Sequence, residues 1–398
     1  MKSSFEIFPD PIHLNAEGQR RRCLIKERHA SGEAIEKELW FLYPAGLPMP
    51  EDDNCDSYLL AALLPAMQLK ADITVYGSVS SELLANLTEL QYVWQKWCPE
   101  QYFLIDIKVD HIRKNECRVD GAVCAFSGGA DAQFTAYRHA TGQAGYSRQA
   151  LRAGVLVHGF DIPLSDTKGF AGAERRASEA LDDLGLSLLT VRSNIRELWG
   201  INWEHHCGAA LASVLCGLSR YVGAGLIGSG EPYDKLFVPW GSHPMTDPLL
   251  STGIFKIIHD GAGFSRSEKI TAISEWEVGI NNLRVCWAGG KHDRNCGVCE
   301  KCVRTRLNFI LADVINPLCF STSIDARLFK PIVLRSDFAF AEWDLIRSDI
   351  IRTGKGLEWL PKVEQVLKRK SGSQLTYLFP LGTQRRVIVK KLRDKYLK

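Results

Sequence analysis

The sequence predicts an α/β protein built around a doubly wound parallel sheet. Short apolar runs alternate with helical spacings of apolar residues between residues 121 and 227. A glycine turn, Ser127-Gly128-Gly129, joins the first apolar run to the first helix, and four closely spaced cysteines follow the alternation. Strands that alternate with helices form parallel sheets, which bind ligands at the carboxyl ends of their strands. We therefore expect the functional residues at these ends.

Composition indicates a globular protein. The 398 residues are 45% hydrophobic and 24% charged, enough for two or three domains and too apolar for extensive disorder. Residues 1–9 lack the apolar core of a signal peptide, and no stretch approaches the roughly 20 apolar residues of a membrane span. Twelve cysteines indicate thiol or metal chemistry in a reducing compartment, so we expect a cytoplasmic protein without a membrane partner. A net charge of +3 does not by itself indicate a nucleic-acid partner.

Residues 1–117 predict a small N-terminal appendage of mixed α/β type. Its predicted elements are, in order, strands at 22–26 and 38–43, a short helix or buried segment over 57–69 that Pro65 interrupts, a strand at 72–76, a helix at 80–97 and a strand at 102–109. The region carries no chemical motif of its own, which favours a docking or lid subdomain.

The core domain, residues 118–310, begins with a strand at 121–126, the glycine turn and a helix over 130–140. Glycines let backbone N–H groups approach an anion, and a helix N-terminus adds partial positive charge. The turn therefore predicts a phosphate cradle, although an ordinary strand-to-helix turn has the same pattern. It is not a Walker A loop, because no Lys-Ser/Thr pair follows, and it is not the dinucleotide motif GxGxxG.

Three further strands are predicted at 153–158, 186–191 and 224–227, separated by helices at 172–184 and 203–218. The strand ends are followed by polar or glycine-rich segments: His158-Gly159, Arg192 to Asn194 and Gly228 to Glu231. In a parallel sheet these ends meet the glycine turn along one edge. Their convergence indicates a binding site more strongly than any single motif does.

Four cysteines at the end of the core domain, Cys286, Cys296, Cys299 and Cys302, have the spacing of a zinc site. The C-x-x-C knuckle directs two thiolates to one point, and the last cysteine lies one helical turn further along. A set of four thiolates favours zinc, and neighbouring basic side chains offset its negative charge. Disulfides are disfavoured in a reducing compartment, and an iron–sulfur cluster has no support beyond the spacing. We expect a structural zinc knuckle over residues 286–302.

Residues 311–398 predict a helical and basic C-terminal region. Its basic residues fall in two clusters, Lys368, Arg369 and Lys370, then Arg385, Arg386, Lys390, Lys391, Arg393 and Lys395. Such clusters can neutralise nucleic-acid phosphates, or they can form a solvated helix face. We favour the solvated face, because Tyr396 is the one aromatic residue interleaved with them.

The motif Ser-Gly-Gly-x-Asp at 127–131 resembles the PP-loop of the ATP pyrophosphatases. Together with the C-x9-C-G-x-C-x-x-C pattern that ends at Cys302, it resembles the 7-cyano-7-deazaguanine synthase family over residues 120–310. The resemblance implies a PP-loop fold of the adenine nucleotide alpha hydrolase type, with ATP, Mg²⁺ and Zn²⁺ as cofactors. It implies zinc binding by the four cysteines and ATP binding by Ala125, Phe126, Ser127, Gly128, Gly129, Asp131, His158, Gly159, Phe160, Arg192 and Gly228.

The same resemblance implies an ATP-dependent carbon–nitrogen ligase. Its substrate would be the carboxylate of 7-carboxy-7-deazaguanine, which is adenylated with release of pyrophosphate and then of AMP. The expected catalytic residues are Ser127, Asp131 and Lys269. A deazaguanine needs a carboxylate for its N–H groups and an aromatic surface for its face, so the candidate substrate contacts are Glu231, Tyr233, Trp240 and Asp247. An ordered loop packed on the sheet edge is an equal alternative for this segment. The product would be an amide or nitrile for queuosine-like biosynthesis, or a conjugate of the deazapurine with a protein or nucleic acid in antiviral defence. A homodimer, in which the partner is a second copy of the chain, is a further expectation.

Three departures from the family pattern keep other functions open. Ala132 replaces the serine that usually follows the motif aspartate, the segment 231–248 differs from the synthase's substrate segment, and both terminal regions are extra. One alternative is another PP-loop adenylating enzyme that acts on tRNA, although a thiolating enzyme is disfavoured because Cys124 lies inside a strand. The other alternative is a catalytically degenerate binding subunit of a complex, for which Ala132 is the main support.

Overall fold

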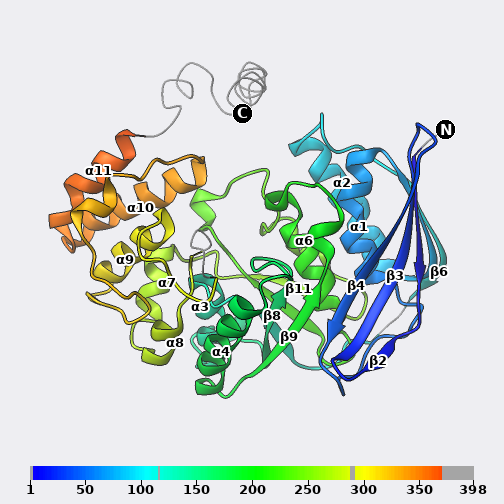
Figure 1. Cartoon of the computed structure of the whole chain (residues 1–398), viewed down its shortest axis with the longest axis horizontal. Coiled ribbons are helices and arrows are strands. Elements are labelled where there is room, and N and C mark those ends of the chain that lie inside the picture. Colours follow the sequence, from blue (N-terminus) through cyan, green and yellow to red (C-terminus); the bar gives the residue numbers. More distant parts are fainter. Residues whose placement is uncertain (1–2, 115–116, 287–291, 370–398) are drawn as a thin grey trace.

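The computed structural model describes residues 3–114, 117–286 and 292–369, and a single β-sheet runs through it (Figure 1). Within these residues ten strands follow the order β11-β10-β7-β8-β9-β4-β3-β1-β5-β6, and β2 pairs with β3 off this path. The strands are β1 (Ser4–Pro9), β2 (His13–Asn15), β3 (Gly18–Arg28), β4 (Ala34–Tyr43), β5 (Asp72–Ser80), β6 (Ile107–Arg113), β7 (Ala122–Ala125), β8 (Leu151–His158), β9 (Ser187–Ser193), β10 (Ala224–Gly228) and β11 (Lys256–Asp260).

The strands of the core domain form the parallel half of this sheet. β11, β10, β7, β8 and β9 are neighbours in that order, and each adjacent pair is parallel. From β7 the chain moves to β8 and β9 on one side, and it later returns to β10 and β11 on the other. Open α/β sheets bind ligands at such a reversal of strand order, at the carboxyl ends of the strands. The prediction of an α/β protein with a large, mostly parallel sheet is confirmed.

The N-terminal strands extend the same sheet. β9 pairs antiparallel with β4 at Phe41↔Ser193 and Leu42↔Arg192. β4, β3 and β1 continue antiparallel, and β5 and β6 then run parallel to β1. One hydrophobic cluster contains side chains from β1, β3, β4 and β5 together with β7, β8, β9 and β10. Pairing between β4 and β9 joins segments far apart in the chain, so local sequence patterns do not indicate it.

The sheet differs from the sequence prediction most at four strands, and β3, β4 and β5 extend beyond their predicted bounds of 22–26, 38–43 and 72–76. β1, β2 and β11 are not among the predicted strands. The predicted strand at 102–109 is wrong in its bounds, because β6 begins at Ile107. Tyr102 lies before the strand, where its ring packs 5.2 Å from that of Trp94 and its hydroxyl lies 3.0 Å from Nδ1 of His205. The ring of Tyr102 therefore packs against helix α2, and the residue is not part of a strand.

Helices cover both faces of the sheet. Successive residues of a strand point to opposite faces. Accordingly Val123 belongs to the hydrophobic cluster that contains side chains of α1, α2 and α6, whereas Cys124 belongs to the cluster that contains side chains of α3, α4, α7, α8 and α9. The helices are α1 (Asp56–Leu69), α2 (Ser81–Trp97), α3 (Ala130–Ala140), α4 (Thr167–Asp183), α5 (Ile195–Leu198), α6 (Trp203–Cys216), α7 (Arg266–Ala272), α8 (Glu277–Asn282), α9 (Glu300–Leu311), α10 (Asp337–Thr353) and α11 (Leu360–Lys368). Short 3₁₀ helices are η1 (Gly145–Ser147), η2 (Tyr233–Lys235), η3 (Asp247–Leu250), η4 (Ala326–Phe329) and η5 (Leu357–Trp359).

Helix α1 continues through Pro65, so the predicted interruption is wrong. Proline has no backbone N–H, and the carbonyl of Ala61, four residues earlier, therefore loses its intrahelical donor. His206 of α6 supplies a donor instead, with Nε2 at 2.9 Å from the Ala61 oxygen. Helix α6 thus satisfies the carbonyl group that the proline leaves open.

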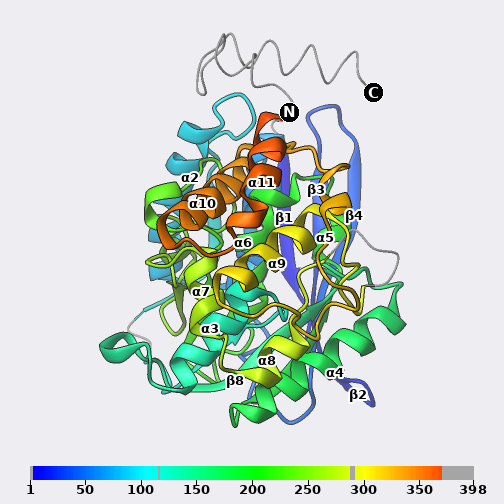
Figure 2. The ribbon, with the colours of Figure 1, turned by 90° about the vertical axis from the view of Figure 1, so that its left-hand side faces the viewer.

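The C-terminal helices pack around a hydrophobic core of their own, at the end of the molecule opposite β3 and β4 (Figures 1 and 2). Apolar side chains of α9, α10 and α11 make up a third hydrophobic cluster. Of the two predicted basic clusters, Lys368 is exposed and Arg369 donates to the carbonyl of Phe329 at 2.8 Å. The remaining basic residues, Lys370, Arg385, Arg386, Lys390, Lys391, Arg393 and Lys395, lie outside the described residues, as does Tyr396.

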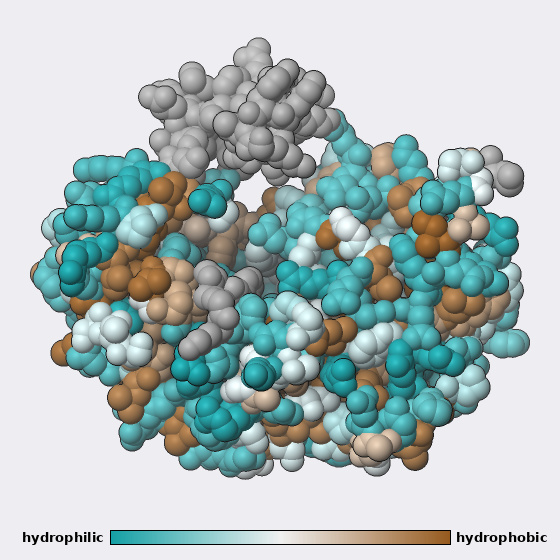
Figure 3. Space-filling view, in the orientation of Figure 1, coloured by the Kyte–Doolittle hydropathy of each residue, from teal (hydrophilic) through white to brown (hydrophobic). Residues whose placement is uncertain are grey.

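The surface seen in the orientation of Figure 1 is mainly hydrophilic (Figure 3). Hydrophobic residues are scattered across it, and several gather where the C-terminal helices lie. Among the described residues, no helix combines the length and apolar character needed to cross a membrane.

Candidate functional site

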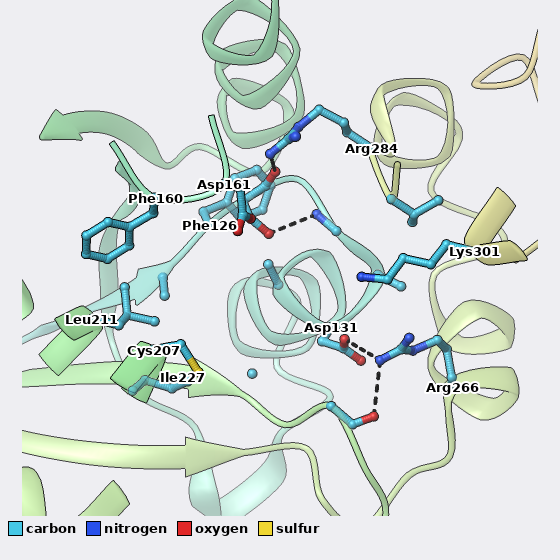
Figure 4. A pocket seen from close by; sticks show the side chains of 18 of the residues that line it. Phe126, Asp131, Phe160, Asp161, Cys207, Leu211, Ile227, Arg266, Arg284 and Lys301 are labelled. Atoms are coloured by element: carbon cyan, nitrogen blue, oxygen red, sulfur yellow. Dashed lines mark hydrogen bonds and ion pairs between the residues drawn. The ribbon is translucent and has the colours of Figure 1, made fainter. Parts of the chain in front are cut away.

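A cavity of about 490 Å³ lies at the carboxyl ends of β7, β8 and β10 (Figure 4). Its lining includes Phe126 after β7, Phe160 after β8 and Gly228 at the end of β10. Side chains from α6, α7, α9 and α10 complete its walls. Strand ends that are far apart in the sequence therefore converge on one site, at the reversal of strand order.

The glycine turn borders this cavity with backbone N–H groups. β7 ends at Ala125, and α3 begins at Ala130 with Gly129 as an N-cap that no described side chain caps. Gly128 has φ of +77°, a conformation that glycine adopts without steric cost. Ser127 reinforces the turn, because its Oγ accepts a long hydrogen bond from the Gly129 N–H at 3.4 Å. The first turn of α3 can therefore direct its free N–H groups at an anion.

Arg284 holds the shape of the turn. Its backbone N–H donates to the Gly128 carbonyl at 2.8 Å, and its Nη2 donates to the Ser127 carbonyl at 2.9 Å. The segment that leads into the cysteine cluster thus also supports the glycine turn. Sequence reasoning missed Arg284, whose one signal is its position two residues before Cys286.

Asp131, in the first turn of α3, is paired with two cations. Its Oδ2 lies 2.8 Å from Nη2 of Arg266, and its Oδ1 lies 3.2 Å from Nζ of Lys269. Arg266 lines the cavity, whereas Lys269 is 1% exposed and also donates to the carbonyl of Ser229. Lys269 therefore positions Asp131 and the end of β10 rather than facing a ligand.

A network of ion pairs extends from Asp131 to the C-terminal region. Glu342 of α10 lies 3.5 Å from Arg266 and 2.9 Å from Arg304, which is in turn 3.2 Å from Glu300. Glu342 and Arg304 are 4% and 1% exposed. Charges buried to this degree are stable only when they are paired. Helix α10 is therefore tied to the cavity wall by charge.

The cavity has an apolar end and a cationic end (Figure 4). Phe160 and Cys207 lie toward the apolar end, together with aliphatic side chains of α6 and β10. Arg266 and Lys301 lie toward the cationic end, and Arg304 also lines the cavity. Sequence reasoning missed Lys301 and Arg304 as site residues. Their spacing of three residues on α9, one helical turn, is the signal that could have indicated a shared face.

Seven of the predicted ATP-binding residues line the cavity. They are Ala125, Phe126, Ser127, Gly129, Asp131, Phe160 and Gly228. Gly128 belongs to the turn itself. Gly228 lies close to α3, the helix that follows the turn. A Cβ added at Gly228 would lie 2.8 Å from the carbonyl oxygen of Asp131.

His158, Gly159 and Arg192 lie outside the cavity lining. His158 is buried, donates from Nε2 to the Pro163 carbonyl at 2.9 Å and has a pKa that burial lowers. Gly159 has φ of +105° and lies against the backbone of Ser193. Arg192 points away, with Nη1 3.5 Å from a carboxylate oxygen of Glu17. These residues therefore shape the strand ends. Of the segment 158–160, which the resemblance implies for backbone contacts to adenine, Phe160 lines the cavity.

Of the four predicted substrate contacts, Glu231 and Trp240 line the cavity and Tyr233 does not. Glu231 is 3% exposed, and burial raises its pKa to about 7 against the opposing attraction of Arg266. Tyr233 is 63% exposed on η2. The segment after β10 therefore contributes an acid and an aromatic ring to the site.

Asp247, the fourth, is fully buried and organises its own segment. Its carboxylate accepts a hydrogen bond from Oγ of Ser242 at 2.8 Å and from the backbone N–H of His243 at 3.1 Å. It also lies 2.7 Å from Nδ1 of His259 on β11. Sequence reasoning cannot separate this role from ligand binding, because an aspartate in a turn-rich segment binds nearby backbone groups as readily as a ligand.

The four cysteines lie together, as their spacing predicts. Their Sγ atoms are all within 4.8 Å of one another, with 3.7 Å between Cys286 and Cys299 and 3.8 Å between Cys296 and Cys302. A tetrahedral site with metal–sulfur bonds of about 2.3 Å has sulfur–sulfur edges of about 3.8 Å. Gly297, at φ of +76°, makes the turn of the knuckle. This donor set can hold a metal ion such as zinc.

The residues around the turn fit a polyphosphate better than a protein-bound Mg²⁺. Both carboxylate oxygens of Asp131 are paired with cations, and Ala132 supplies no hydroxyl. Phosphate oxygens bound at the turn would face uncapped N–H groups, with Arg266 and Lys301 at the same end of the cavity.

Comparisons of this chain with protein-family models, with curated proteins and with solved structures give no match. The geometry of the cavity and of the cysteine cluster therefore carries the functional argument.

Proposed function

We propose that this protein is an ATP-dependent carbon–nitrogen ligase that adenylates a carboxylate, with 7-carboxy-7-deazaguanine as the acid that the sequence resemblance implies. The observation that carries the proposal is that the two ends of the cavity differ in charge. An uncapped glycine turn and several cations lie at one end, and an apolar, partly aromatic surface lies at the other. A nucleotide is complementary to this arrangement, because it has anionic phosphates at one end and a base at the other.

The reaction needs charge stabilisation more than a protein nucleophile. The substrate carboxylate attacks the α-phosphorus, and the bond from that phosphorus to the bridging oxygen breaks, so that pyrophosphate departs. Arg266, Lys301 and the N–H groups of the turn would neutralise the charge that develops on it. An amine then forms the new bond to the acyl carbon, and AMP leaves with the carboxylate oxygen. We derive no step through Mg²⁺, because Asp131 is engaged by two cations.

The choice of amine decides the product. Ammonia would give an amide, and a second activation could dehydrate the amide to a nitrile. A protein or nucleic-acid amine would give a conjugate, the outcome suited to a role in defence. The zinc bound by the cysteine cluster would be structural, since its four thiolates leave no coordination position for substrate.

A second candidate is a nucleotide-binding subunit without catalysis. Two observations favour it: the ion pairs that occupy Asp131, and Ala132, which is 8% exposed and has no hydroxyl to offer a phosphate. Such a protein would bind nucleotide at the turn without releasing AMP. A PP-loop enzyme that adenylates tRNA remains an alternative within the enzyme class.

The test incubates the full-length chain with ATP and 7-carboxy-7-deazaguanine and measures AMP and pyrophosphate. We expect both products only when the acid is present. Lys301→Gln removes a cation that lines the cavity and should lower kcat/KM by about 100-fold or more. Lys355→Gln, whose lysine pairs with Asp313 away from the cavity, is the matched control and should retain activity.

Two results would separate the candidates. Nucleotide binding without AMP, with this acid or with others, would contradict the ligase and favour the binding subunit. AMP formation that depends on tRNA rather than on the deazapurine acid would favour the tRNA-adenylating alternative.

A further inference from the structure

Helix α10 reaches the cavity from outside the core domain. Ser336, Phe338 and Ala339, at the start of this helix, line the cavity beside residues of the core. The helix belongs to the region that follows the residues covered by the family resemblance. Without it, the cavity would lack one wall.

Buried charges fix the position of this wall. Phe338 and Glu342 are four residues apart on α10, so they project from the same side of the helix. Glu342 pairs with Arg266 and Arg304, and the guanidinium carbons of these arginines lie 5.9 and 5.4 Å from the centroid of the Phe338 ring. Cations at this distance are attracted to an aromatic face. The same two arginines therefore line the cavity and hold Phe338 in place.

Phe338 stacks on Trp240, which comes from the segment after β10. Their ring centroids are 5.7 Å apart and their planes differ by 18°. Both rings line the cavity. Because the two rings stack on each other, the pair offers a ligand its outer face and its edges, and this aromatic wall favours planar ligands.

Glu231 adds a hydrogen-bond acceptor to the same cavity. Its side chain is buried, and its Oε1 has no hydrogen-bond partner among the described residues. An unpaired carboxylate oxygen at this depth is costly unless a ligand or a water molecule donates to it. The charged groups around it are Arg266 and Lys269 on α7, Asp131 on α3 and Glu342 on α10.

We propose that Trp240, Phe338 and Glu231 form the subsite for the acid substrate, a planar heterocycle that carries a carboxylate and ring N–H donors. This inference rests on the proposed ligase function and deepens it. The ring lies along the aromatic wall, and its N–H groups donate to Glu231. Arg266 and Arg304 pack against Phe338, so the carboxylate of the ring lies beside the cations where the nucleotide phosphates bind. The C-terminal region thus selects the substrate of the core domain.

Calorimetric titration of the full-length chain tests the two subsites separately. One ligand is an ATP analogue that cannot be cleaved, and the other is 7-carboxy-7-deazaguanine. Phe338→Leu should weaken binding of the acid by about 10-fold while the Kd of the ATP analogue changes by less than about threefold. Tyr233→Leu alters an exposed aromatic residue of the same segment as Trp240 and should leave both affinities unchanged.

Glu231→Gln tests the N–H contacts. The wild-type protein should bind 7-carboxy-7-deazaguanine about 10-fold or more tightly than the analogue that lacks the 2-amino group. The variant should lose this discrimination, because an amide cannot accept as two carboxylate oxygens do. A merely structural role of Glu231 would weaken both ligands equally, and that result would contradict its place in the subsite.

The outcomes distinguish this inference from the function on which it rests. If both variants bind the acid as the wild type does while AMP is still formed, the subsite lies elsewhere and the ligase function stands. If the wild type binds the ATP analogue and no acid, the ligase function is overturned, and the subsite with it.

Discussion

The pairing of Pro65 with His206 allows a sharp test of how this fold tolerates a proline inside a helix. Pro65 leaves the Ala61 carbonyl without its helical donor, and Nε2 of His206 donates to that carbonyl at 2.9 Å. His206 is fully buried, so no water replaces the bond if the histidine is lost. His206→Leu, which keeps side-chain volume, should therefore lower the free energy of unfolding by about 1–3 kcal/mol.

Replacing the proline should restore the stability that His206→Leu removes. Pro65→Ala restores an N–H that can donate to Ala61 within the helix. In the double variant with His206→Leu, this internal bond should recover most of the loss. A double-mutant cycle should therefore give a coupling free energy of at least about 1 kcal/mol, larger than the scatter expected for independent sites.

The same histidine makes a pH-dependent contribution to stability. Burial lowers the pKa of His206 to about 4, although its bond to the Ala61 carbonyl opposes the shift. In this arrangement Nδ1 has no partner among the described residues, so a proton there would be buried without an acceptor. Below an unfolded pKa of about 6.5 the unfolded chain takes up a proton that the folded chain does not, so stability falls as the pH falls from about 6.5 toward 4. By pH 5 the loss should reach about 2 kcal/mol.

The assay is urea unfolding at pH 7 and pH 5, followed by tryptophan fluorescence and circular dichroism, for the wild type, both single variants and the double variant. His206→Leu should show a smaller loss of stability between the two pH values than the wild type. The reasoning fails if His206→Leu is as stable as the wild type at pH 7, or if Pro65→Ala does not reduce the effect of His206→Leu.

Three further predictions concern the site and its supports. Cys299→Ser should remove the metal from a protein that otherwise contains about one zinc per chain, measured by mass spectrometry of the metal, and should lower the melting temperature. Gly159→Ala should destabilise the fold by about 3 kcal/mol, measured by urea unfolding, because a Cβ there would clash with a backbone carbonyl at a φ of +105°. Glu342→Gln should cost about 3 kcal/mol in the same assay and weaken binding of the ATP analogue, because it leaves the buried Arg304 and the partly exposed Arg266 with less compensating charge.

Each of these has a matched control in the chain. Cys117→Ser changes an exposed cysteine and should retain the metal. Gly185→Ala changes a glycine with φ of +68° and no atom within 4 Å of the added Cβ. This variant should lose less unfolding free energy than Gly159→Ala, because it has backbone strain without a steric clash. Glu364→Gln changes an exposed glutamate of α11 and should have an effect within about 0.5 kcal/mol. If a variant behaves no differently from its control, the reason given for it is refuted.

Much of the core was predictable because its signals are local. The apolar run before Ser127 and the helical spacing after Gly129 agree with β7 and α3, since both depend on neighbours in sequence. The cysteine set was predictable for the same reason, because a C-x-x-C turn and one helical turn place three thiols by covalent geometry alone. Cys286 was the harder member, and its approach to the other three rests on the segment that Arg284 anchors to the turn.

Two predicted site residues have other partners in the structure. Arg192 follows a strand end as a ligand residue would, but its strand pairs with β4 and its side chain meets Glu17 there. Asp247 resembles a ligand contact in sequence and is a buried hydrogen-bond acceptor in space. For Arg192 the deciding partner is far away in the sequence, whereas Asp247 binds Ser242 and His243 nearby and His259 on β11.

The sequence by itself determined the strand–turn–helix that presents free N–H groups, the alternation that makes the sheet parallel, and the thiol spacing of the metal site. Tertiary structure alone decided which charges face the cavity. Asp131 is paired with Arg266 and Lys269, and Phe338 enters the site from the C-terminal region because Glu342 is paired with Arg266 and with the buried Arg304. The physical reason is that backbone preferences act between neighbours in sequence, whereas the burial and pairing of a charge depend on what the whole fold packs around it.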